Sequence, residues 1–440
     1  MPAAHESKEL LYLWPMRRLL LLAALAAVSC GTRAPKEETM AQLRERVFSL
    51  AQVQTVYMDS LLMAKMPGQA GHDGGVDVMA GQNIVDVVMA GADRPSRAWL
   101  CPRTFQGDTL VTSDIGWWTS GFYPGVLWLT YMDTDDIAFR DLAIKHTLPL
   151  AGLLDRETDH DIGFQLMSGF GLWFSVDKVN PRENDALSRT EIQEILRKGA
   201  AKLADRFIPS AGVIRSWNWG EWNIPVIIDN MMNLELLMVY GDREVAEKHA
   251  LTTAKNHFRE DGTSFHLVDY ADDGAVLGKQ TVQGFADESA WARGQAWALY
   301  GYAMMALHEK KDQELAEAFY RVAAKLEDWL YAHLPEDGVP YWDFSQTNYR
   351  DASAGAILAC GLLKMWDLRG RKADDPALAM AERILRTLAS PEYLAEPRTN
   401  GGFLLKHSVG NIPGHSEVDV PLTYADYYFL EALTLYPSEQ

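Results

Sequence analysis

The sequence predicts an all-α protein, an (α/α)6 barrel in which an inner ring of helices is surrounded by an outer ring. From Gly121 to the C-terminus, apolar residues recur at helical spacing and strand signals are few. The helices expected from this pattern come in pairs, joined by loops rich in Gly, Pro and Trp. Helix pairs repeated along a chain form closed or superhelical arrays, and about twelve helices closing on themselves make a double ring.

The expected helices follow one another along the chain. The first, at residues 41–66, has an amphipathic pattern. A segment rich in Gly, Asp and small residues then spans 67–97, where we expect a surface insertion or loop. The repeated helices are expected at 121–131, 137–155, 164–176, 189–207, 227–240, 243–259, 289–309, 313–333, 352–369, 376–388 and 422–436. No linker divides this array, so residues 41–440 are expected to form a single domain.

The N-terminus has the pattern of an export signal. Two arginines, Arg17 and Arg18, precede an apolar run of about ten residues, and small residues lead to Cys30. A cysteine at the cleavage point is typical of a bacterial lipoprotein signal, in which the thiol is lipidated; an ordinary signal peptide with an incidental cysteine is the alternative. We therefore expect a lipoprotein-type signal peptide at 1–30, a tether at 31–40, and an exported protein, periplasmic or at the cell surface, attached to the membrane only through Cys30.

Composition excludes some classes of function. The chain carries 41 basic and 60 acidic residues, a formal net charge of −19. The resulting negative electrostatic potential disfavours binding of nucleic acid. Beyond Cys30, the cysteines are Cys101 and Cys360, which we expect to be small buried hydrophobic residues without a disulfide or a metal. The 14 tryptophans exceed what packing alone usually requires, and several stand beside polar residues.

Two aspartates stand inside apolar segments, where an ionised acid is costly to bury without a partner. Asp161 follows His160 and precedes Ile-Gly-Phe, and Asp229 follows two isoleucines. Indole and imidazole side chains surround both in the sequence. This pattern indicates a carbohydrate site with paired acids. Because Ile227, Ile228 and the methionines after Asp229 remove water from its carboxyl, we expect the protonated form to be favoured when substrate is bound.

Aromatic clusters supply the other candidates. Trp118 precedes an apolar helix, and buried aromatics behind a helix cap are the alternative explanation. Trp217 is one of three indoles within six residues, interleaved with polar groups, a pattern suited to stacking on sugars. His266 is a candidate donor to an oxyanion or a structural histidine. Arg293 lies between two indoles, Trp291 and Trp297, where it is expected to hold a carboxylate or to form a structural pair with Asp287 or Glu288.

As a set, these segments resemble the unsaturated glucuronyl hydrolases, glycoside hydrolase family 88. The resemblance runs from about residue 102 to the C-terminus, in the family's order. It rests on 118–122 (WTSGF), 160–164 (HDIGF), 227–229 (IID), 291–297 (WARGQAW), 341–344 (YWDF), 349–354 (YRDASA) and 425–428 (ADYY). It implies the (α/α)6 barrel, no metal or other cofactor, and an oligosaccharide substrate that ends in a 4-deoxy-4,5-unsaturated uronic acid.

Carried over residue by residue, the resemblance assigns Asp229 as the general acid/base and Asp161 as the second essential carboxylate. The expected sugar-lining residues are Trp118, His160, Trp217, His266, Gln283, Arg293 and Trp297, and Trp291 joins them from its place beside Arg293. One position departs from the family pattern: family members can have His where this chain has Val282. The hydrogen bonding of the sugar beside Gln283 is therefore left open.

The substrate explains the need for two acids. Its C4=C5 bond is an enol ether conjugated to a carboxylate, so the reaction begins by protonating C4. Positive charge then develops at C5 and the ring oxygen, water adds at C5, and the resulting hemiketal opens and releases the remaining sugar. One carboxyl supplies the proton and directs water, and the other stabilises or orients the site.

Three alternatives stay open. The unsaturated rhamnogalacturonyl hydrolases share the barrel and the hydration chemistry, although the Arg293–Trp297 block favours the glucuronyl type. An ordinary glycosidase would act on saturated sugars. A glycan-binding lipoprotein without activity would use the same indoles but would not need two acids.

Overall fold

The structure is a computed structural model that describes residues 38–66, 99–182 and 185–437. One compact unit runs from Met40 to the C-terminus and is the unit described below. The expected signal peptide at 1–30 with Cys30, most of the tether and the expected insertion at 67–97 lie outside the described residues. Among the described residues, no helix combines the length and the apolar character that a membrane span requires.

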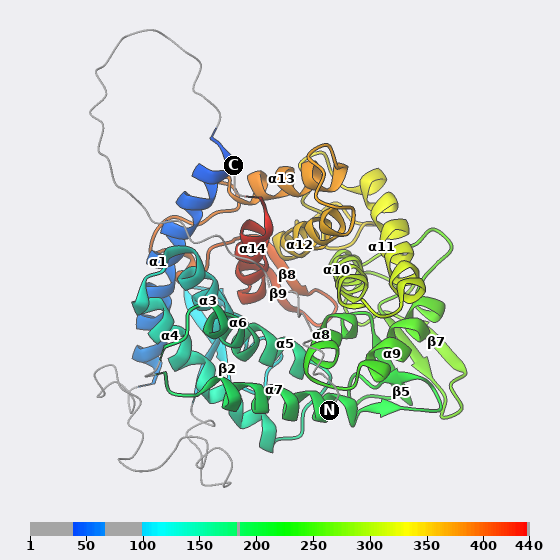
Figure 1. Cartoon of the computed structure of the whole chain (residues 1–440). Helices are drawn as coiled ribbons and strands as arrows, with labels where there is room; N and C mark the ends of the chain where they lie inside the picture. The colour runs from blue at the N-terminus through cyan, green and yellow to red at the C-terminus, as the bar shows by residue number, and fades with distance from the viewer. Residues whose placement is uncertain (1–37, 67–98, 183–184, 438–440) are drawn as a thin grey trace, which may run out of the picture. The chain divides into compact units, whose positions relative to one another are not determined.

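Two concentric rings of helices build the unit, as Figure 1 shows. The inner ring consists of α3 (Phe122–Thr134), α5 (Ile162–Leu166) continued by the π-helical turn η3 (Met167–Gly171) and α6 (Leu172–Val179), α8 (Asn230–Tyr240), α10 (Ala292–His308), α12 (Ala352–Leu368) and α14 (Thr423–Leu435). Each inner helix packs on the next, and α14 packs back on α3, so the ring closes. The outer ring consists of α1 (Met40–Lys65), α4 (Ile137–Thr147), α7 (Arg189–Ala204), α9 (Arg243–Asn256), α11 (Gln313–His333) and α13 (Pro376–Leu388).

The two rings differ in amino-acid pattern because they differ in burial. Helix α10 is buried at every position from Ala292 to Ala306, as expected of a helix surrounded by others. Helix α11 buries a single stripe at helical spacing, from Phe319 through Ala323 and Leu326 to Leu330, and its other faces meet solvent. The predicted (α/α)6 barrel is therefore confirmed, and α11 and α13 have the predicted bounds.

The helix N-termini also differ between the rings. Outer helices α4, α7, α9, α11 and α13 begin with a side-chain cap, from Asp136, Ser188, Asp242, Asp312 and Asp375 respectively. Inner helices α3, α5, α8, α10 and α14 begin without a side-chain cap hydrogen bond, and only α12 has one, from Asp351. Without a side-chain cap, the positive end of the helix dipole stays available to another partner.

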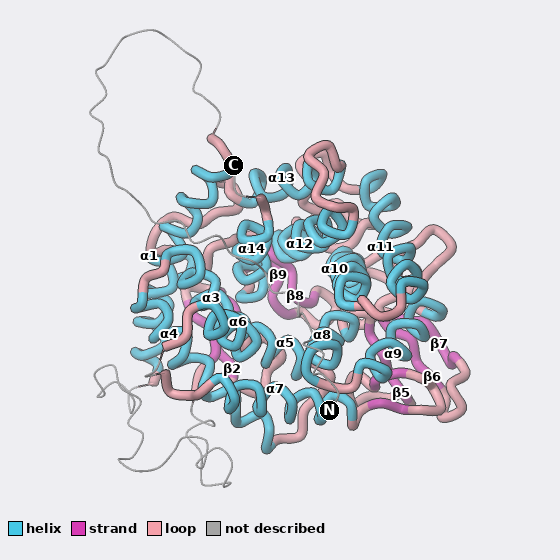
Figure 2. Tube along the Cα trace, viewed as in Figure 1, coloured by secondary structure: helices cyan, strands magenta, loops and turns pink. Residues whose placement is uncertain are grey.

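Short antiparallel sheets occupy the connections that lead into the inner helices (Figure 2). They are β1 (Cys101–Gln106) with β2 (Thr109–Ser113), β3 (Phe207–Ile208) with β4 (Val213–Ile214), β5 (Ile224–Ile227) with β6 (Leu267–Tyr270) and β7 (Val276–Gln280), and β8 (Ser408–Asn411) with β9 (Ser416–Val420). The predicted helix at 227–240 was wrong at its start, because Ile227 ends β5, where it pairs with Leu267. A β-branched, Pro-containing run favours a strand over a helix there.

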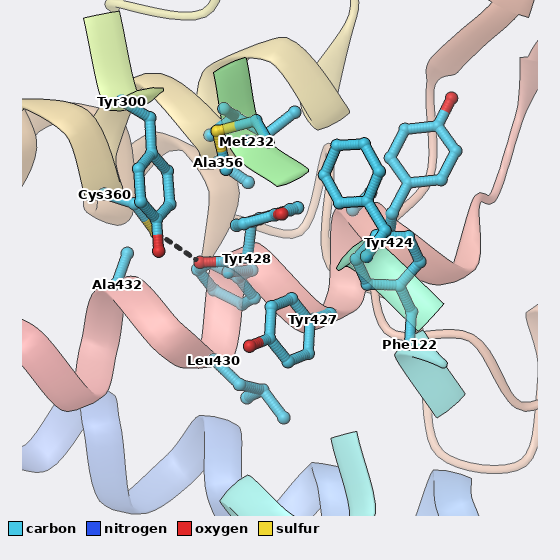
Figure 3. Close-up of a cluster of buried hydrophobic side chains, with 14 of the residues drawn as sticks. Phe122, Met232, Tyr300, Ala356, Cys360, Tyr424, Tyr427, Tyr428, Leu430 and Ala432 are labelled. Carbon is cyan, nitrogen blue, oxygen red and sulfur yellow. Dashed lines mark hydrogen bonds between the residues drawn. The ribbon is translucent and has the colours of Figure 1, made fainter. Parts of the chain in front are cut away.

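Aromatic side chains fill the centre of the ring where α14 meets α3 and α12 (Figure 3). The Phe122 ring packs on Tyr427 and Tyr428, with ring centroids 5.3 and 5.7 Å away. The Cys360 thiol donates to the Tyr428 carbonyl at 3.2 Å. Cys360 and Cys101 are free and buried, which confirms the prediction that both act as small hydrophobic residues.

Candidate active site

The two predicted acids occupy equivalent places at the starts of neighbouring inner helices. Asp161 stands at the N-cap position of α5 and Asp229 at that of α8, yet neither carboxyl caps its own helix. Strand β5 positions Asp229, because its pairing with β6 extends to a hydrogen bond from Ile228 N to the His266 carbonyl at 2.9 Å. The backbone therefore fixes the place of Asp229, and neither carboxyl is engaged in capping its own helix.

His266 faces Asp229, and its hydrogen bonds fix the tautomer of the neutral ring. Its Nδ1 atom accepts hydrogen bonds from the backbone N–H groups of Val282 at 3.0 Å and Gln283 at 3.3 Å. In neutral His266 the proton is therefore on Nε2, which lies 3.4 Å from Asp229 Oδ1. The departure at Val282 leaves this contact intact, because the backbone of residue 282, not its side chain, holds the imidazole.

Asp161 lies among polar groups from α8 and from its own loop. Asn233 on α8 donates to its Oδ1 at 3.5 Å, His160 Nε2 lies 3.5 Å from the same oxygen, and Asp159 accepts the backbone N–H of Asp161 at 2.9 Å. Burial raises the pKa of Asp161 well above its usual value, and the negative charges of Asp159 and Asp229 raise it further. Asp161 therefore retains its proton more readily than an exposed aspartate.

His160 is neutral at this place. Its side chain is buried, and burial lowers its pKa to about 4, although the carboxylates of Asp159 and Asp229 act in the opposite direction. A neutral imidazole beside Asp161 serves as a hydrogen-bonding group and does not neutralise the acid.

Several buried polar atoms around the two acids have no hydrogen-bond partner within the part of the chain that the structure describes. They are Asp229 Oδ1, His266 Nε2, His160 Nδ1 and Trp217 Nε1. An unpaired buried polar group costs free energy, and native proteins leave few of them. Asp229 contacts His266, and Trp217 packs on His160, so a polar ligand bound at these residues would find donors and acceptors that lack partners.

The predicted tryptophans divide into two groups. Trp217 is 7% exposed and packs on His160 and on Trp219, with ring centroids 6.4 and 4.7 Å away. Trp118 is half-buried and packs on Tyr424, and Trp297 is 1% exposed against Phe164 and Tyr428. Trp291 lies between His266 and Arg293. Trp297 thus belongs to the aromatic core in this structure, whereas Trp217 and Trp118 border the acids and the ends of the inner helices.

Arg293 has partners that the sequence did not indicate. Its guanidinium donates to the β8 carbonyls of Val409 and of Gly410, the latter at 2.7 Å, and lies 3.7 Å from Asp351 Oδ2. Neither Asp287 nor Glu288 is its partner among these contacts, and the side chain is 1% exposed. In this structure Arg293 therefore clamps the β8–β9 hairpin to the starts of α10 and α12.

The residues that sequence reasoning missed are the supports of the acids. Asn233 both donates to Asp161 and accepts the Phe164 N–H at 2.7 Å, and Asp159 orients Asp161. The spacing of Asp229 and Asn233, four residues apart at a helix start, is a signal that could have found Asn233. Among the described residues, no group of three or more His, Cys, Asp or Glu side chains could hold a metal ion.

A closed double ring of helices, with two acids and stacked indoles at the starts of its inner helices, defines the chain as an (α/α)6-barrel hydrolase acting on sugars. No family model matches the sequence. The chain is 39% identical over 330 residues to an unsaturated glucuronyl hydrolase of Formosa agariphila, covering 72% of this chain and 79% of that protein. It is 30% identical over 334 residues to an unsaturated chondroitin disaccharide hydrolase of Streptococcus pneumoniae, covering 72% and 81%.

A solved structure supports the same assignment. The crystal structure of an unsaturated glucuronyl hydrolase specific for heparin superposes with a TM-score of 0.73 at 35% identity, covering 89% of this chain and 97% of that one. The chain therefore belongs to the family of unsaturated glucuronyl hydrolases.

Proposed function

We propose that the protein removes a 4-deoxy-4,5-unsaturated uronic acid from the non-reducing end of oligosaccharides made by polysaccharide lyases. The reaction is hydration of the C4=C5 double bond. The observation that carries this proposal is the pairing of Asp161 and Asp229, in electrostatic reach of one another, with unpartnered polar atoms on the surrounding side chains. Relatives named for unsaturated glucuronyl groups and for an unsaturated chondroitin disaccharide support the substrate class.

In the proposed mechanism Asp229 protonates C4 and then accepts a proton from the water that adds at C5. The bound uronate brings a further negative charge beside both acids, and a nearby like charge favours the protonated form of a carboxyl. His266, with its proton on Nε2, donates to Asp229 or to a substrate oxygen. Asp161 holds its own proton and orients the sugar ring, and neutral His160 hydrogen-bonds without competing for that proton.

The uncapped inner helices fit an anionic substrate. Backbone N–H groups at helix N-termini attract carboxylates, and α5, α8 and α10 begin at Asp161, Asp229 and Trp291 without a side-chain cap bond. This arrangement offsets the strongly acidic composition of the whole chain. Several first-turn N–H groups are already bonded, Phe164 N–H to Asn233 Oδ1 and Ala292 N–H to the Trp342 carbonyl, so it is the positive ends of the helix dipoles that favour the uronate carboxylate here. The Arg293 guanidinium donates to β8 carbonyls instead.

Ultraviolet absorbance tests the reaction, because the conjugated double bond absorbs and its hydration removes the absorbance. Purified protein added to lyase-made unsaturated disaccharides should cause the absorbance to decay as free sugar appears. Release of sugar with the absorbance retained would indicate an ordinary glycosidase, and binding without either change would indicate a glycan-binding protein. Saturated disaccharides of the same linkage serve as the control and should not be cleaved.

A second proposal concerns location. We propose that the protein is exported and acylated at Cys30, with the pattern Arg17, Arg18, an apolar run and Cys30 in its support. Cys30→Ala should move the protein from the membrane fraction to the soluble exported fraction of a bacterial host. Membrane association that persists in this variant would contradict lipidation as the anchor.

A further inference from the structure

The connection between β4 and β5 presents an exposed indole beside the acids. Trp219 is 61% exposed, although an indole of this size is seldom left in water without a role. Its ring lies parallel to that of Trp217, at a centroid distance of 4.7 Å and an interplanar angle of 12°. One face of Trp219 is thus covered by Trp217, and the other face is left to solvent.

The loop holds this indole in a fixed place. Trp222 packs edge-on against both other rings, at 5.7 and 6.1 Å, and its indole N–H donates to Gln280 Oε1 on β7 at 3.0 Å. Gly220 has a φ of +87°, and a Cβ there would lie 2.6 Å from the Trp222 ring, so the turn depends on glycine. The three indoles therefore form a built surface, which we call the indole platform (Trp217, Trp219 and Trp222).

The indole platform is continuous with the acids. Trp217 packs on His160 and shares a small apolar cluster with Ile227 and Leu267, the residues that lead to Asp229 and follow His266. Trp217 is more than nine-tenths buried, and its indole N–H has no partner in the described part of the chain. A buried donor without a partner, next to an exposed stacking face, fits a ligand with one polar edge and one apolar face.

The other exposed large aromatic residues in the described ranges also stand in connections that lead into inner helices. Trp117, Phe285 and Tyr349 stand in the connections that lead into α3, α10 and α12, as Trp219 stands in the connection into α8. No such residue is exposed on the outer helices of the described chain. Among the residues that the structure describes, the exposed large aromatic rings therefore lie in connections that lead into inner helices.

We propose that Trp219 stacks on the leaving sugar, the residue to which the unsaturated uronic acid is attached. This inference rests on the proposed function, since it names the second sugar of the same site. A pyranose ring has an apolar face of C–H groups that stacks on an indole, and Trp217 behind Trp219 keeps that indole in position. The edge of the platform supplies acceptors for sugar hydroxyls, because the neighbouring Asn218 and Glu157 side chains are hydrogen-bonded to each other at 3.2 Å and are exposed.

Steady-state kinetics with two substrates tests the proposal. The first is an unsaturated disaccharide and the second is the methyl glycoside of the same unsaturated uronic acid, which has no leaving sugar. Trp219→Ala should raise KM for the disaccharide about 3- to 10-fold, the value of one aromatic stacking contact, with kcat little changed. It should leave the methyl glycoside unaffected. Trp219→Phe should restore most of the disaccharide affinity.

The control is Leu251→Ala, which removes an apolar side chain of comparable exposure, 46%, from outer helix α9. It should behave as the unmodified protein on both substrates. Equal effects of Trp219→Ala on both substrates, or no effect on the disaccharide, would overturn the proposal. If the unmodified protein consumes the double bond of neither substrate, the proposed function fails instead. Calorimetric titration of the disaccharide into Asp229→Asn with and without Trp219→Ala then still reports whether Trp219 contributes to binding.

Discussion

His266 Nε2 lies 3.4 Å from Asp229 Oδ1, and the backbone of residues 282 and 283 fixes which nitrogen carries the proton. Both atoms are buried and have no hydrogen-bond partner in the described residues. The pair is therefore preorganised but not satisfied, and a ligand hydroxyl lying beside both atoms, donating to Asp229 and accepting from His266, would satisfy both. This is the arrangement expected where an acid delivers a proton to a substrate rather than supporting the fold.

The first prediction concerns Asp229. Asn keeps the shape of the side chain but cannot transfer a proton, so Asp229→Asn should lose turnover by about 10²- to 10⁴-fold, the usual contribution of a general acid or base. Binding of the unsaturated disaccharide, measured by calorimetry, should be retained through the indoles and the helix N-termini. Near-normal turnover by the folded variant would remove Asp229 from this role and make Asp161 the next candidate.

The second prediction concerns pH. The charge of Asp159 helps to raise the pKa of Asp161, and the backbone N–H of Asp161 binds Asp159 Oδ1. Asp159→Asn removes the charge and keeps an acceptor oxygen. The pKa of Asp161 should then fall, so its protonated form is lost at lower pH. The alkaline limb of the pH–rate profile should move to lower pH.

Asp141→Asn is the control for this experiment, because it removes an exposed charge from outer helix α4. Its profile should match that of the unmodified protein. An alkaline limb that stays in place in Asp159→Asn, while catalysis continues, would contradict the tuning of Asp161 by Asp159.

The third prediction tests whether Arg293 stabilises the fold through β8 or binds the carboxylate of the substrate. Its guanidinium donates to two carbonyls of β8, and a lysine cannot reproduce that fork. Arg293→Lys should lower the free energy of unfolding by about 1.5–3 kcal/mol, the value of hydrogen bonds from a charged group. Urea unfolding measures this loss. Arg321→Lys, exposed on α11, is the matched control and should be neutral. Unchanged stability with a raised KM would show instead that Arg293 holds the substrate.

Helical periodicity was enough to predict the two rings, because apolar spacing records burial directly. The bounds of α11 and α13 followed from Asp312 and Asp375, which cap them, and from the stripe each helix buries. The short sheets were not predicted, since two- to six-residue strands carry too little periodicity. Among them, strand β5 matters most for the site, because it determines the position of Asp229.

The candidate acids were found in the sequence because a carboxyl in an apolar run is conspicuous, whereas their supports were not. Arg293 meets Val409 across 116 residues, and no local pattern encodes such a contact. The contact between Asn233 and Asp161 is likewise distant in the sequence, because Asn233 comes from the next inner helix. The roles of the individual site residues stay predictions, which the variants described here test.

The last prediction concerns the close approach of the two helices that carry the acids. A Cβ built on Gly163 in α5 would lie 2.6 Å from the Asn233 Cα and 2.7 Å from its Cβ in α8. The backbone atom cannot move without displacing α8, so Gly163→Ala should force α5 and α8 apart. The Asn233 contacts to Asp161 and Phe164 would then lengthen. We expect a loss of about 1–3 kcal/mol in the free energy of unfolding, as in other overpacked cores, together with reduced kcat.

Gly355→Ala in α12 is the matched control, because its new Cβ would meet Val339 at an ordinary 3.5 Å. That variant should be stabilised by about 0.5–1 kcal/mol, since Ala favours a helix over Gly. Equal stability changes in the two variants, measured by urea unfolding, would contradict the view that Gly163 is required for the approach of α5 to α8.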